Sequence, residues 1–372
     1  MTRFPGESLL HNERANPAVL PAVTSRALTF HRSMPGYAET PLIEASSAAS
    51  AIGARQVLVK HEASRFGLPA FKILGASWAT ANAVITELER RELPAPEIGE
   101  GFDAIAKAAR QLHPMTLCCA TDGNHGRAVA HMAKRFGFSA RIYVPDNMAS
   151  ARIEAIAGEG AEVIKLNGTY DEAVARSAAD ANDNCLIISD TSWPGYETIP
   201  RWVIEGYGTI FAELTEQTHG TLPDLWAVQM GVGALAAAAI PAAKSAGAKV
   251  LGVEPATAAC VQRSLEAGAP TLVPGPHTSI MAGLNCGLPS EIAWPVLQAG
   301  LDDAISVHDR RAEEAMRLLA KDGIVAGETG AAGLAGLLAW ADTFGADLRN
   351  RTVLIVTTEG ATDPVNYQRI VG

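Results

Sequence analysis

Short apolar runs alternate with segments of helical pattern along the middle of this 372-residue chain. The strand-like runs are residues 116–121, 140–145, 161–167 and 184–190. The helix-like segments between them are residues 126–137, 149–160 and 170–183. Strands of about six residues separated by helices of about twelve are typical of βαβ units, in which neighbouring strands run parallel. The pattern therefore predicts an α/β domain over residues 84–200, with a mostly parallel sheet flanked by helices.

A second alternation follows, with strand-like runs at residues 225–230, 249–255, 304–308 and 352–358. A chain of 372 residues is longer than one hydrophobic core usually serves, so two domains are expected. The sequence then predicts a large, discontinuous domain made of residues 1–83 and 201–372. Residues 84–200 form the small domain inserted into it.

Composition argues against a nucleic-acid or membrane partner. The net charge is −10, with 30 Lys and Arg residues against 40 Asp and Glu residues, and no basic run is present. The most apolar stretch, residues 226–243, is rich in Gly and Ala and contains a proline, which favours a buried strand–turn–helix over a spanning helix. The N-terminal residues lack a signal-peptide core, and the five cysteines show no CxxC pair and no metal-ligand spacing. We therefore expect a cytoplasmic protein without a metal site.

A glycine-containing turn joins the strand at 225–230 to an Ala-rich helix. Its residues are Gly231, Val232, Gly233, Ala234 and Leu235. Glycines let a ligand approach the backbone, and the N–H groups at the start of a helix attract anions. The turn could hold a phosphate group, although a plain tight β–α turn would have the same sequence.

Lys72 is the only ionisable residue between Arg65 and Glu87, and it lies among Phe71 and Ile73. A lysine in such a setting can simply lay its stem along apolar surface with its amine in water. Alternatively, a partly desolvated amine becomes a nucleophile that forms a Schiff base with a carbonyl group.

The segment 121–126, TDGNHG, again joins a predicted strand to a helix and supplies a carboxylate, an amide and an imidazole. Asp122 or Asn124 could merely cap the helix. However, α/β proteins also bind their ligands at the carboxyl ends of strands. A Schiff-base lysine, a phosphate turn and a polar loop together match what pyridoxal phosphate requires.

The chain resembles the fold-type II pyridoxal-phosphate enzymes, the tryptophan synthase β family, and within it the diaminopropionate ammonia-lyase subgroup. The matching stretches are ASRFGLPAFKILGAS, ATDGNHGRAVA, SDTSWPGYETIP, QMGVGALAAA, SIMAGLNCG, AGETGAAGLAGLL and TTEGATDPVNY. They extend from about residue 40 to the C-terminus. The resemblance implies two α/β domains with the cofactor in the cleft between them, and commonly a homodimer.

The resemblance also implies roles for particular residues. Lys72 would form the Schiff base, Asn124 would contact the phenolic oxygen of the cofactor, and Gly231 to Leu235 would wrap its phosphate. Thr357 would face the pyridine nitrogen, although the adjacent Thr358 could hold that role.

The implied reaction is α,β-elimination of L-2,3-diaminopropionate to pyruvate and two ammonia. Lys72 would take the α-proton of the L-isomer, Asp122 that of the D-isomer, and Asp190 would act as the acid for the leaving amine. Asp190 could instead cap the turn that follows its strand. Further substrate contacts are expected from Thr121, Gly123, His125, Tyr170 and Gly283, although His125 and Tyr170 could equally be packing residues.

Three alternatives remain open at this point. A related β-eliminase could act on serine, threonine or 3-hydroxyaspartate, or on an N-substituted diaminopropionate. A non-catalytic amino-acid sensor could also have kept the fold. Asp122 and Asp190 favour diaminopropionate, because a hydroxy-amino acid needs no pair of carboxylates for a cationic leaving group.

Overall fold

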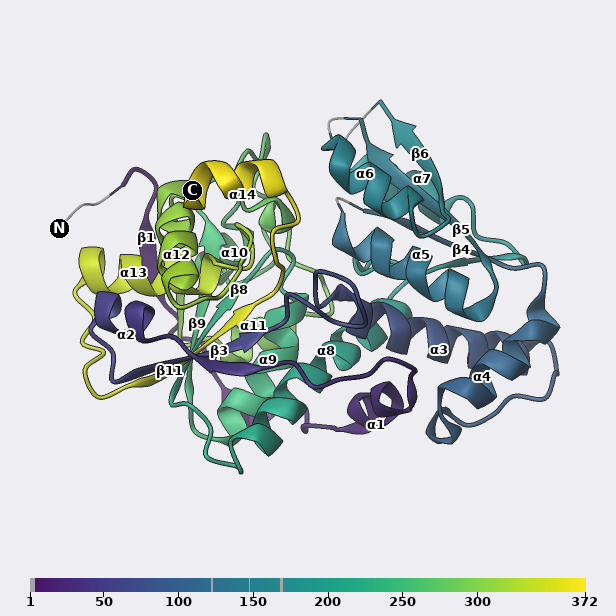
Figure 1. Ribbon diagram of the computed structural model, residues 1–372, viewed down its shortest axis with the longest axis horizontal. Coiled ribbons are helices and arrows are strands. Elements are labelled where there is room, and N and C mark those ends of the chain that lie inside the picture. The colour runs from purple at the N-terminus through teal and green to yellow at the C-terminus, as the bar shows by residue number, and fades with distance from the viewer. Residues whose placement is uncertain (1–3, 122, 147, 168–169) are drawn as a thin grey trace. The chain divides into compact units, whose positions relative to one another are not determined.

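The computed structural model describes residues 4–121, 123–146, 148–167 and 170–372. Contacts between residues divide the chain into two compact units (Figure 1). The first unit, here called the glycine-turn unit, contains residues 1–23, 39–64 and 210–372. The second, the lysine unit, contains residues 24–38 and 65–209.

The strands of the glycine-turn unit form one seven-stranded sheet. Its order is β1 (Ser8–His11), β10 (Asp303–Val307), β9 (Lys249–Pro255), β8 (Leu225–Gln229), β11 (Thr352–Thr357), β3 (Gln56–His61) and β2 (Leu42–Glu44). The edge strands β1 and β2 are antiparallel to their neighbours, and the five strands between them are parallel. The helices of this unit are α2 (Ser46–Ile52), α9 (Ala234–Ser245), α10 (Cys260–Ala267), α11 (Trp294–Gly300), α12 (Asp309–Lys321), α13 (Ala332–Phe344) and α14 (Pro364–Val371).

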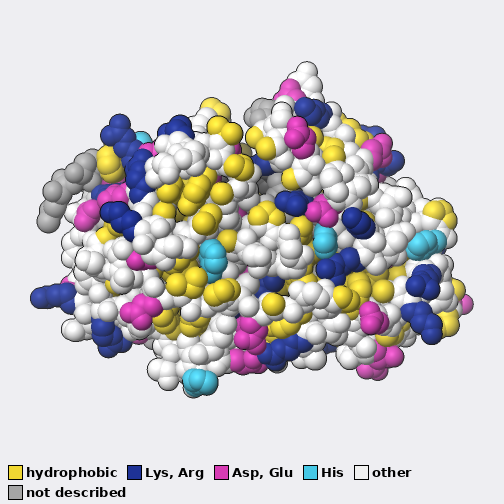
Figure 2. Space-filling view, in the orientation of Figure 1, with side chains coloured by type: hydrophobic (Ala, Val, Ile, Leu, Met, Phe, Trp, Pro, Cys, Tyr) yellow, Lys and Arg dark blue, Asp and Glu magenta, His cyan; other side chains and the backbone are white. Residues whose placement is uncertain are grey.

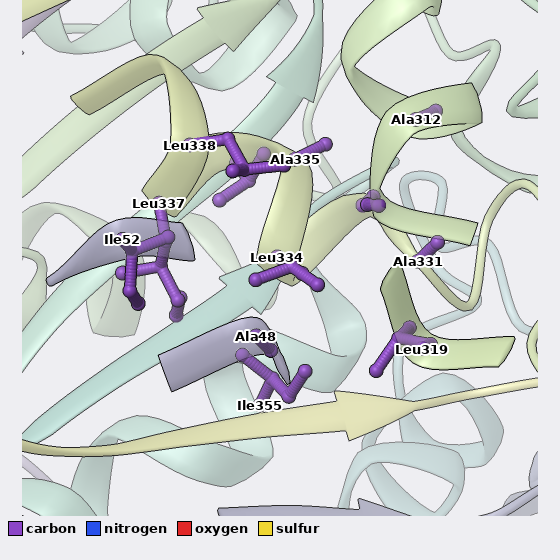
Figure 3. Close-up of a cluster of buried hydrophobic side chains, with 14 of the residues drawn as sticks. Ala48, Ile52, Ala312, Leu319, Ala331, Leu334, Ala335, Leu337, Leu338 and Ile355 are labelled. Atoms are coloured by element: carbon purple, nitrogen blue, oxygen red, sulfur yellow. The ribbon is translucent and has the colours of Figure 1, made fainter. Parts of the chain in front are cut away.

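A large hydrophobic core of this unit lies on one face of the sheet, and strand residues that face the other way, such as Val250 and Leu354, are buried as well. Every second strand residue joins it, including Val57 and Val59 of β3 and Val353 and Ile355 of β11, because side chains alternate between faces. Helices α2, α12 and α13 cover this face, and Figure 3 shows their contributions as Ala48, Ile52, Ala312, Leu319, Leu334, Ala335, Leu337 and Leu338. On the other face, Trp226 of β8 stacks with Phe211 at 5.4 Å between ring centroids.

The lysine unit has a four-stranded parallel sheet in the order β6 (Glu162–Leu166), β5 (Ser139–Pro145), β4 (Thr116–Ala120) and β7 (Cys185–Ile187). Its helices are α1 (Arg26–Ser33), α3 (Lys72–Arg90), α4 (Phe102–Ala109), α5 (Asn124–Phe136), α6 (Ser150–Ala157) and α7 (Tyr170–Ala178). Helix α8 (Thr198–Gln217) begins in this unit and ends in the other.

Helices α5 and α7 cover opposite faces of the four-stranded sheet (Figure 1). Gly126 of α5 packs against Ile142, whereas Ala173 of α7 packs with Tyr143, and adjacent strand residues face opposite ways. The sheet is therefore doubly wound, as the alternating sequence pattern predicts.

The eight strands expected from the sequence are all present, and β1, β2 and β3 were not expected. The predicted domain boundaries differ from the compact units. Residues 83 and 84 both lie inside α3, and residues 200 and 201 both lie inside α8, so the backbone has no linker at either place. The lysine unit consequently includes Lys72, which the sequence had assigned to the large domain.

On the face drawn in Figure 2, Lys and Arg side chains are interspersed with Asp and Glu side chains, and the described residues form no continuous basic surface there. Among the described residues, no helix is both long and apolar enough to cross a bilayer.

Helices α3 and α8 approach each other closely within the lysine unit. A Cβ at Gly75 would lie 2.5 Å from Cε1 of Tyr207, and one at Gly206 would lie 2.4 Å from the carbonyl oxygen of Leu74. These distances are far below van der Waals contact, so the crossing requires glycine on both helices.

We predict that Gly206→Ala lowers the free energy of unfolding by about 1–3 kcal/mol, because the new methyl group forces the two helices apart. Gly208→Ala is the matched control on the same helix, since its Cβ would have 4.0 Å to the nearest atom. The control should raise stability by up to about 1 kcal/mol through helix propensity. Urea unfolding of both variants measures the difference, and equal effects would contradict the close crossing.

Candidate active site

The residues expected to be functional lie at the carboxyl ends of parallel strands in each unit. In the lysine unit, Thr121 and Asn124 follow β4, and Asp190 follows the adjacent strand β7. In the glycine-turn unit, the turn at 231–235 follows β8, and Thr357 ends the adjacent strand β11. The carboxyl end of the strands is where open α/β sheets bind ligands.

Lys72 is the first residue of α3, and its amine pairs with a carboxylate. Nζ of Lys72 donates a hydrogen bond to Oδ2 of Asp190 at 2.8 Å. The lysine side chain is 27% exposed, and its nitrogen lies 5.6 Å from the ring centroid of Phe71 and 5.9 Å from that of Tyr207. The amine is therefore partly desolvated, between two aromatic rings and a carboxylate.

Asp190 is ionised in this setting. Burial by itself would raise the pKa of Asp190, but the nearby His125 and Lys72 outweigh that effect and lower the pKa to about 2. Nδ1 of His125 lies 3.7 Å from Oδ2 of Asp190, and Nε2 of His125 lies 2.7 Å from the carbonyl oxygen of Ile188. A carbonyl only accepts, so Nε2 carries a proton and Nδ1 is the atom that faces Asp190.

Hydrogen bonds also brace the chain around Asp190. The hydroxyl of Tyr196 donates to the carbonyl oxygen of Ile187 at 2.6 Å and accepts from the N–H of Ser189 at 3.0 Å. The ring of Tyr196 stacks on Trp193 at 4.1 Å between centroids. These contacts fix the end of β7, from which Asp190 extends.

Thr121 closes the turn before α5. Its buried hydroxyl oxygen accepts from the N–H groups of Gly123 and Gly126, each at 3.0 Å. Thr121 thus satisfies an N–H group in the first turn of α5, whose N-cap is Gly123 and whose first residue is Asn124. Asp122 lies outside the described residues.

The glycine turn suits a phosphate group. Gly233 is the N-cap of α9, with φ of +94°, and no side chain caps this helix or places an acidic group in its first turn. A Cβ at Gly233 would lie 2.4 Å from Leu297, and one at Gly231 would lie 3.0 Å from Sγ of Cys286. Position 233 thus requires glycine, and a Cβ at Gly231 would be crowded. Among the described residues no side chain occupies the first N–H groups of α9, which remain available to an anion.

Gly283 packs against this turn, because a Cβ on Gly231 would come within 3.0 Å of its carbonyl oxygen. The N–H of Gly283 donates to the hydroxyl of Thr329 at 3.2 Å. The thiol of Cys260 approaches the carbonyl oxygen of Gly231 at 3.6 Å. Backbone and thiol contacts therefore hold the turn in place.

Two adjacent threonines at the end of β11 have different partners. The hydroxyl of Thr357 lies 2.7 Å from Nδ1 of His61, whereas the hydroxyl of Thr358 accepts from Nε2 of Gln229 at 3.0 Å. Burial lowers the pKa of His61, although Glu62 opposes the shift.

Tyr170 is the first residue of α7, and its side chain lies outside the described part of the structure. Among the described residues, no group of three or more His, Cys, Asp or Glu side chains could hold a metal ion, and all five cysteines are free thiols.

Sequence reasoning missed two neighbours of the expected residues, Tyr207 beside Lys72 and His61 beside Thr357. Gly206, directly before Tyr207, carried a signal for the first, since a glycine within a helical pattern often marks close packing. The pairing of His61 with Thr357 follows from the register of β3 and β11, which no local pattern encodes.

Comparisons with known proteins identify the family of this chain. A family model described as "Pyridoxal-phosphate dependent enzyme" matches residues 34–359. The chain is 34% identical over 381 residues to diaminopropionate ammonia-lyase of Escherichia coli strain K12, covering 97% of this chain and 94% of the relative. It is 29% identical over 274 residues to L-threo-3-hydroxyaspartate ammonia-lyase of Saccharomyces cerevisiae, covering 73% of this chain and 80% of that relative.

Among solved structures, diaminopropionate ammonia-lyase from Escherichia coli, in complex with an aminoacrylate-PLP azomethine reaction intermediate, superposes with a TM-score of 0.85. The two chains are 32% identical, and the match covers 98% of this chain and 96% of that chain. The fold is therefore that of the fold-type II enzymes, and the chain belongs to the family of pyridoxal-phosphate-dependent enzymes.

Proposed function

We propose that this chain is an ammonia-lyase that converts 2,3-diaminopropionate and water into pyruvate and two molecules of ammonia. The near full-length relationship to diaminopropionate ammonia-lyases supports the reaction. The observation that carries the proposal is the 2.8 Å contact between Nζ of Lys72 and Oδ2 of Asp190. It joins the expected nucleophilic lysine to a carboxylate that suits the second amino group of this substrate.

Pyridoxal phosphate, when bound, supplies an electrophilic carbonyl carbon for amines and a ring that takes up the electrons released at the substrate Cα. Lys72 would bond to its carbonyl carbon, and Asn124 would hydrogen-bond its phenolic oxygen. The turn at residues 231–235 would bind its phosphate. Support for the turn comes from the uncapped start of α9 and from the absence of space for a Cβ at Gly231 and Gly233.

Thr358 is the stronger candidate for the hydroxyl that donates a hydrogen bond to the pyridine nitrogen of the cofactor. Thr357 is the second candidate. A hydroxyl that accepts a hydrogen bond directs its own proton elsewhere, and Thr358 accepts from Gln229. Either threonine is neutral, so it would leave the ring a weaker electron sink than an aspartate would, which favours elimination over transamination.

Lys72 and Asp190 divide the proton chemistry between them. Neutral Nζ of Lys72 takes the proton from Cα of the L-isomer, and the carboxylate of Asp190 holds the β-ammonium so that it leaves with its proton. Asp190 suits the second role because its pKa of about 2 keeps it anionic throughout the neutral pH range. Asp122 is proposed as the base for the D-isomer, on the sequence resemblance alone.

Substrate contacts are proposed for Thr121, Gly123, His125, Tyr170 and Gly283, as the resemblance implies. We also propose that the protein is a cytoplasmic homodimer. Support comes from the dimers common among the enzymes it resembles, and from five free thiols, which suit a reducing compartment.

The reaction is tested by counting ammonia per pyruvate with L- and D-diaminopropionate, serine, threonine and 3-hydroxyaspartate. We expect two ammonia per pyruvate from diaminopropionate, because both amino groups leave, and a higher kcat/KM than for any hydroxy-amino acid. A preference for serine, threonine or 3-hydroxyaspartate, with one ammonia per keto acid, would instead assign the chain to the dehydratases. The absence of turnover and of a cofactor absorbance band would favour a sensor.

We predict that Asp190→Asn lowers kcat/KM for diaminopropionate by about 100-fold or more, since a neutral amide cannot hold the leaving ammonium. The loss for serine should be smaller, because serine has no β-ammonium. Asp183→Asn is the control, because Asp183 is an exposed residue that pairs with Arg90. Steady-state kinetics on both substrates measure the two losses. Equal losses of kcat/KM on diaminopropionate and serine would mean that Asp190 acts only by pairing with Lys72 and not on the leaving ammonium.

We predict that Thr358→Val weakens pyridoxal-phosphate binding by about tenfold, the effect of one lost hydrogen bond to a buried group. Thr357→Val should mainly lower the unfolding midpoint, because it leaves His61 without its partner. Absorbance titration of the cofactor and thermal unfolding separate the two variants. The reverse result would assign the pyridine contact to Thr357.

A further inference from the structure

The side-chain amide of Gln229 connects three segments at the carboxyl end of the seven-stranded sheet. Gln229 is the last residue of β8, and its side chain is buried. Nε2 of Gln229 donates to the carbonyl oxygens of Val356 at 2.9 Å and Thr329 at 3.1 Å. It also donates to the hydroxyl oxygen of Thr358 at 3.0 Å. Two N–H groups thus serve three acceptors, so one of the N–H groups is shared.

The neighbours of this amide allow only one orientation. Two of the three acceptors are carbonyl oxygens, which cannot donate, so the nitrogen of the amide must face them. Oε1 of Gln229 therefore points away, and it is buried without a hydrogen-bond partner among the described residues. An unpaired buried oxygen lowers stability, and an apolar side chain would avoid that loss. The N–H groups, which no apolar side chain has, are what the amide provides in return.

The third contact of the amide sets the direction of the Thr358 hydroxyl. An amide nitrogen donates and does not accept, so the oxygen of Thr358 is the acceptor and its own proton is directed elsewhere. Thr358 is buried, and its hydroxyl proton has no acceptor among the described residues. A buried O–H group of this kind is suited to a ligand atom that has a lone pair and no proton.

We propose that Gln229 is a positioning residue whose amide holds the Thr358 hydroxyl as a donor to the pyridine nitrogen of the cofactor. Thr358 follows β11, and the turn at 231–235 follows the adjacent strand β8, so both lie at the carboxyl end of the same sheet. A hydroxyl that donates stabilises the unprotonated nitrogen, whereas a hydroxyl that accepts would stabilise the protonated one. This inference rests on the proposed function, because it requires Thr358 at the pyridine nitrogen.

Titratable groups near this hydroxyl have other hydrogen-bond partners. His61 of β3 contacts the hydroxyl of Thr357, and burial lowers the pKa of His61. The buried carboxylates of Glu328 and Glu359 each accept a hydrogen bond from a side chain of the segment that follows β11. Among the described residues, none of these groups contacts the hydroxyl of Thr358. The amide is therefore the group that determines its direction.

The test measures the protonation of the ring nitrogen in the holoenzyme, loaded with pyridoxal phosphate that carries nitrogen-15 in its ring. The chemical shift of that nucleus distinguishes a protonated from an unprotonated nitrogen, and a pH titration gives the pKa. Gln229→Met keeps the length of the side chain but removes both N–H groups. Two carbonyl oxygens then lose their donor, the Thr358 hydroxyl turns toward them, and its lone pair faces the ring. The ring nitrogen should bind a proton about tenfold more tightly, so its pKa rises, which is the effect of one net hydrogen bond.

A second variant and a matched control accompany this measurement. Gln229→Glu keeps the shape of the side chain and places an acceptor beside Thr358, so it should also raise the pKa of the ring nitrogen, even if the methionine variant does not fold. Gln262→Met is the control, because this buried amide of α10 also donates to two carbonyl oxygens, those of Ser8 and Ala304. The control should lower the unfolding midpoint and leave the ring nitrogen unchanged.

The Thr358→Val background shows whether Gln229 acts through the hydroxyl. There, Gln229→Met should no longer change the pKa of the ring nitrogen, since no hydroxyl is left to turn. An unchanged or lowered pKa in Gln229→Met alone would overturn the proposal, and so would a rise of equal size with and without the hydroxyl. Failure of the proposed reaction looks different. In that case the change at the ring nitrogen persists, but the holoenzyme releases no ammonia from diaminopropionate.

Discussion

The ion pair between Lys72 and Asp190 is the interaction on which the chemistry proposed for this protein depends. A lysine that must serve first as a nucleophile and then as a base cannot remain an ammonium throughout the reaction. A carboxylate at hydrogen-bond distance favours the ammonium form of the lysine when no other group is bonded to its nitrogen. A substrate with one ammonium group for the cofactor and a second for Asp190 is suited to release that restraint. Under the proposed function, the carboxylate that pairs with Lys72 is thus also the group that selects a diamine.

The surrounding structure fixes the carboxylate rather than the lysine. His125 is oriented by the carbonyl oxygen of Ile188, and Tyr196 ties the backbone at Ile187 and Ser189. Lys72, by contrast, reaches Asp190 from the first turn of a helix through a long side chain. Under the proposed function, a fixed carboxylate and a flexible lysine side chain suit their roles, because the lysine must exchange partners during the reaction.

Much of this arrangement follows from local sequence. The strands β4 to β11 have apolar runs bounded by turn residues, and the glycine turn and the loop after β4 lie where parallel strands end. What local patterns do not encode is which elements meet. The partnership of Lys72 with Asp190 joins residues 118 positions apart, and His61 meets Thr357 only through strand register. The position of Tyr207 beside Lys72 likewise follows from the crossing of α3 and α8.

The division of the chain was harder to predict for a related reason. The sequence changes from strand–helix alternation to other patterns near residues 84 and 200, but α3 and α8 continue through both places. Helices are stiff over many residues, so a boundary between compact units follows packing rather than composition. Edge strands such as β1 and β2 are short, and they carry too few residues to show an alternating pattern.

The two glycines at the α3–α8 crossing, Gly75 and Gly206, have a consequence for how such a site can diversify. They set the depth at which the amine emerges, because one extra methyl group would push the helix that carries it outward. Alanine or serine at either position would therefore shift Lys72, the first residue of α3, without changing any side chain of the candidate site.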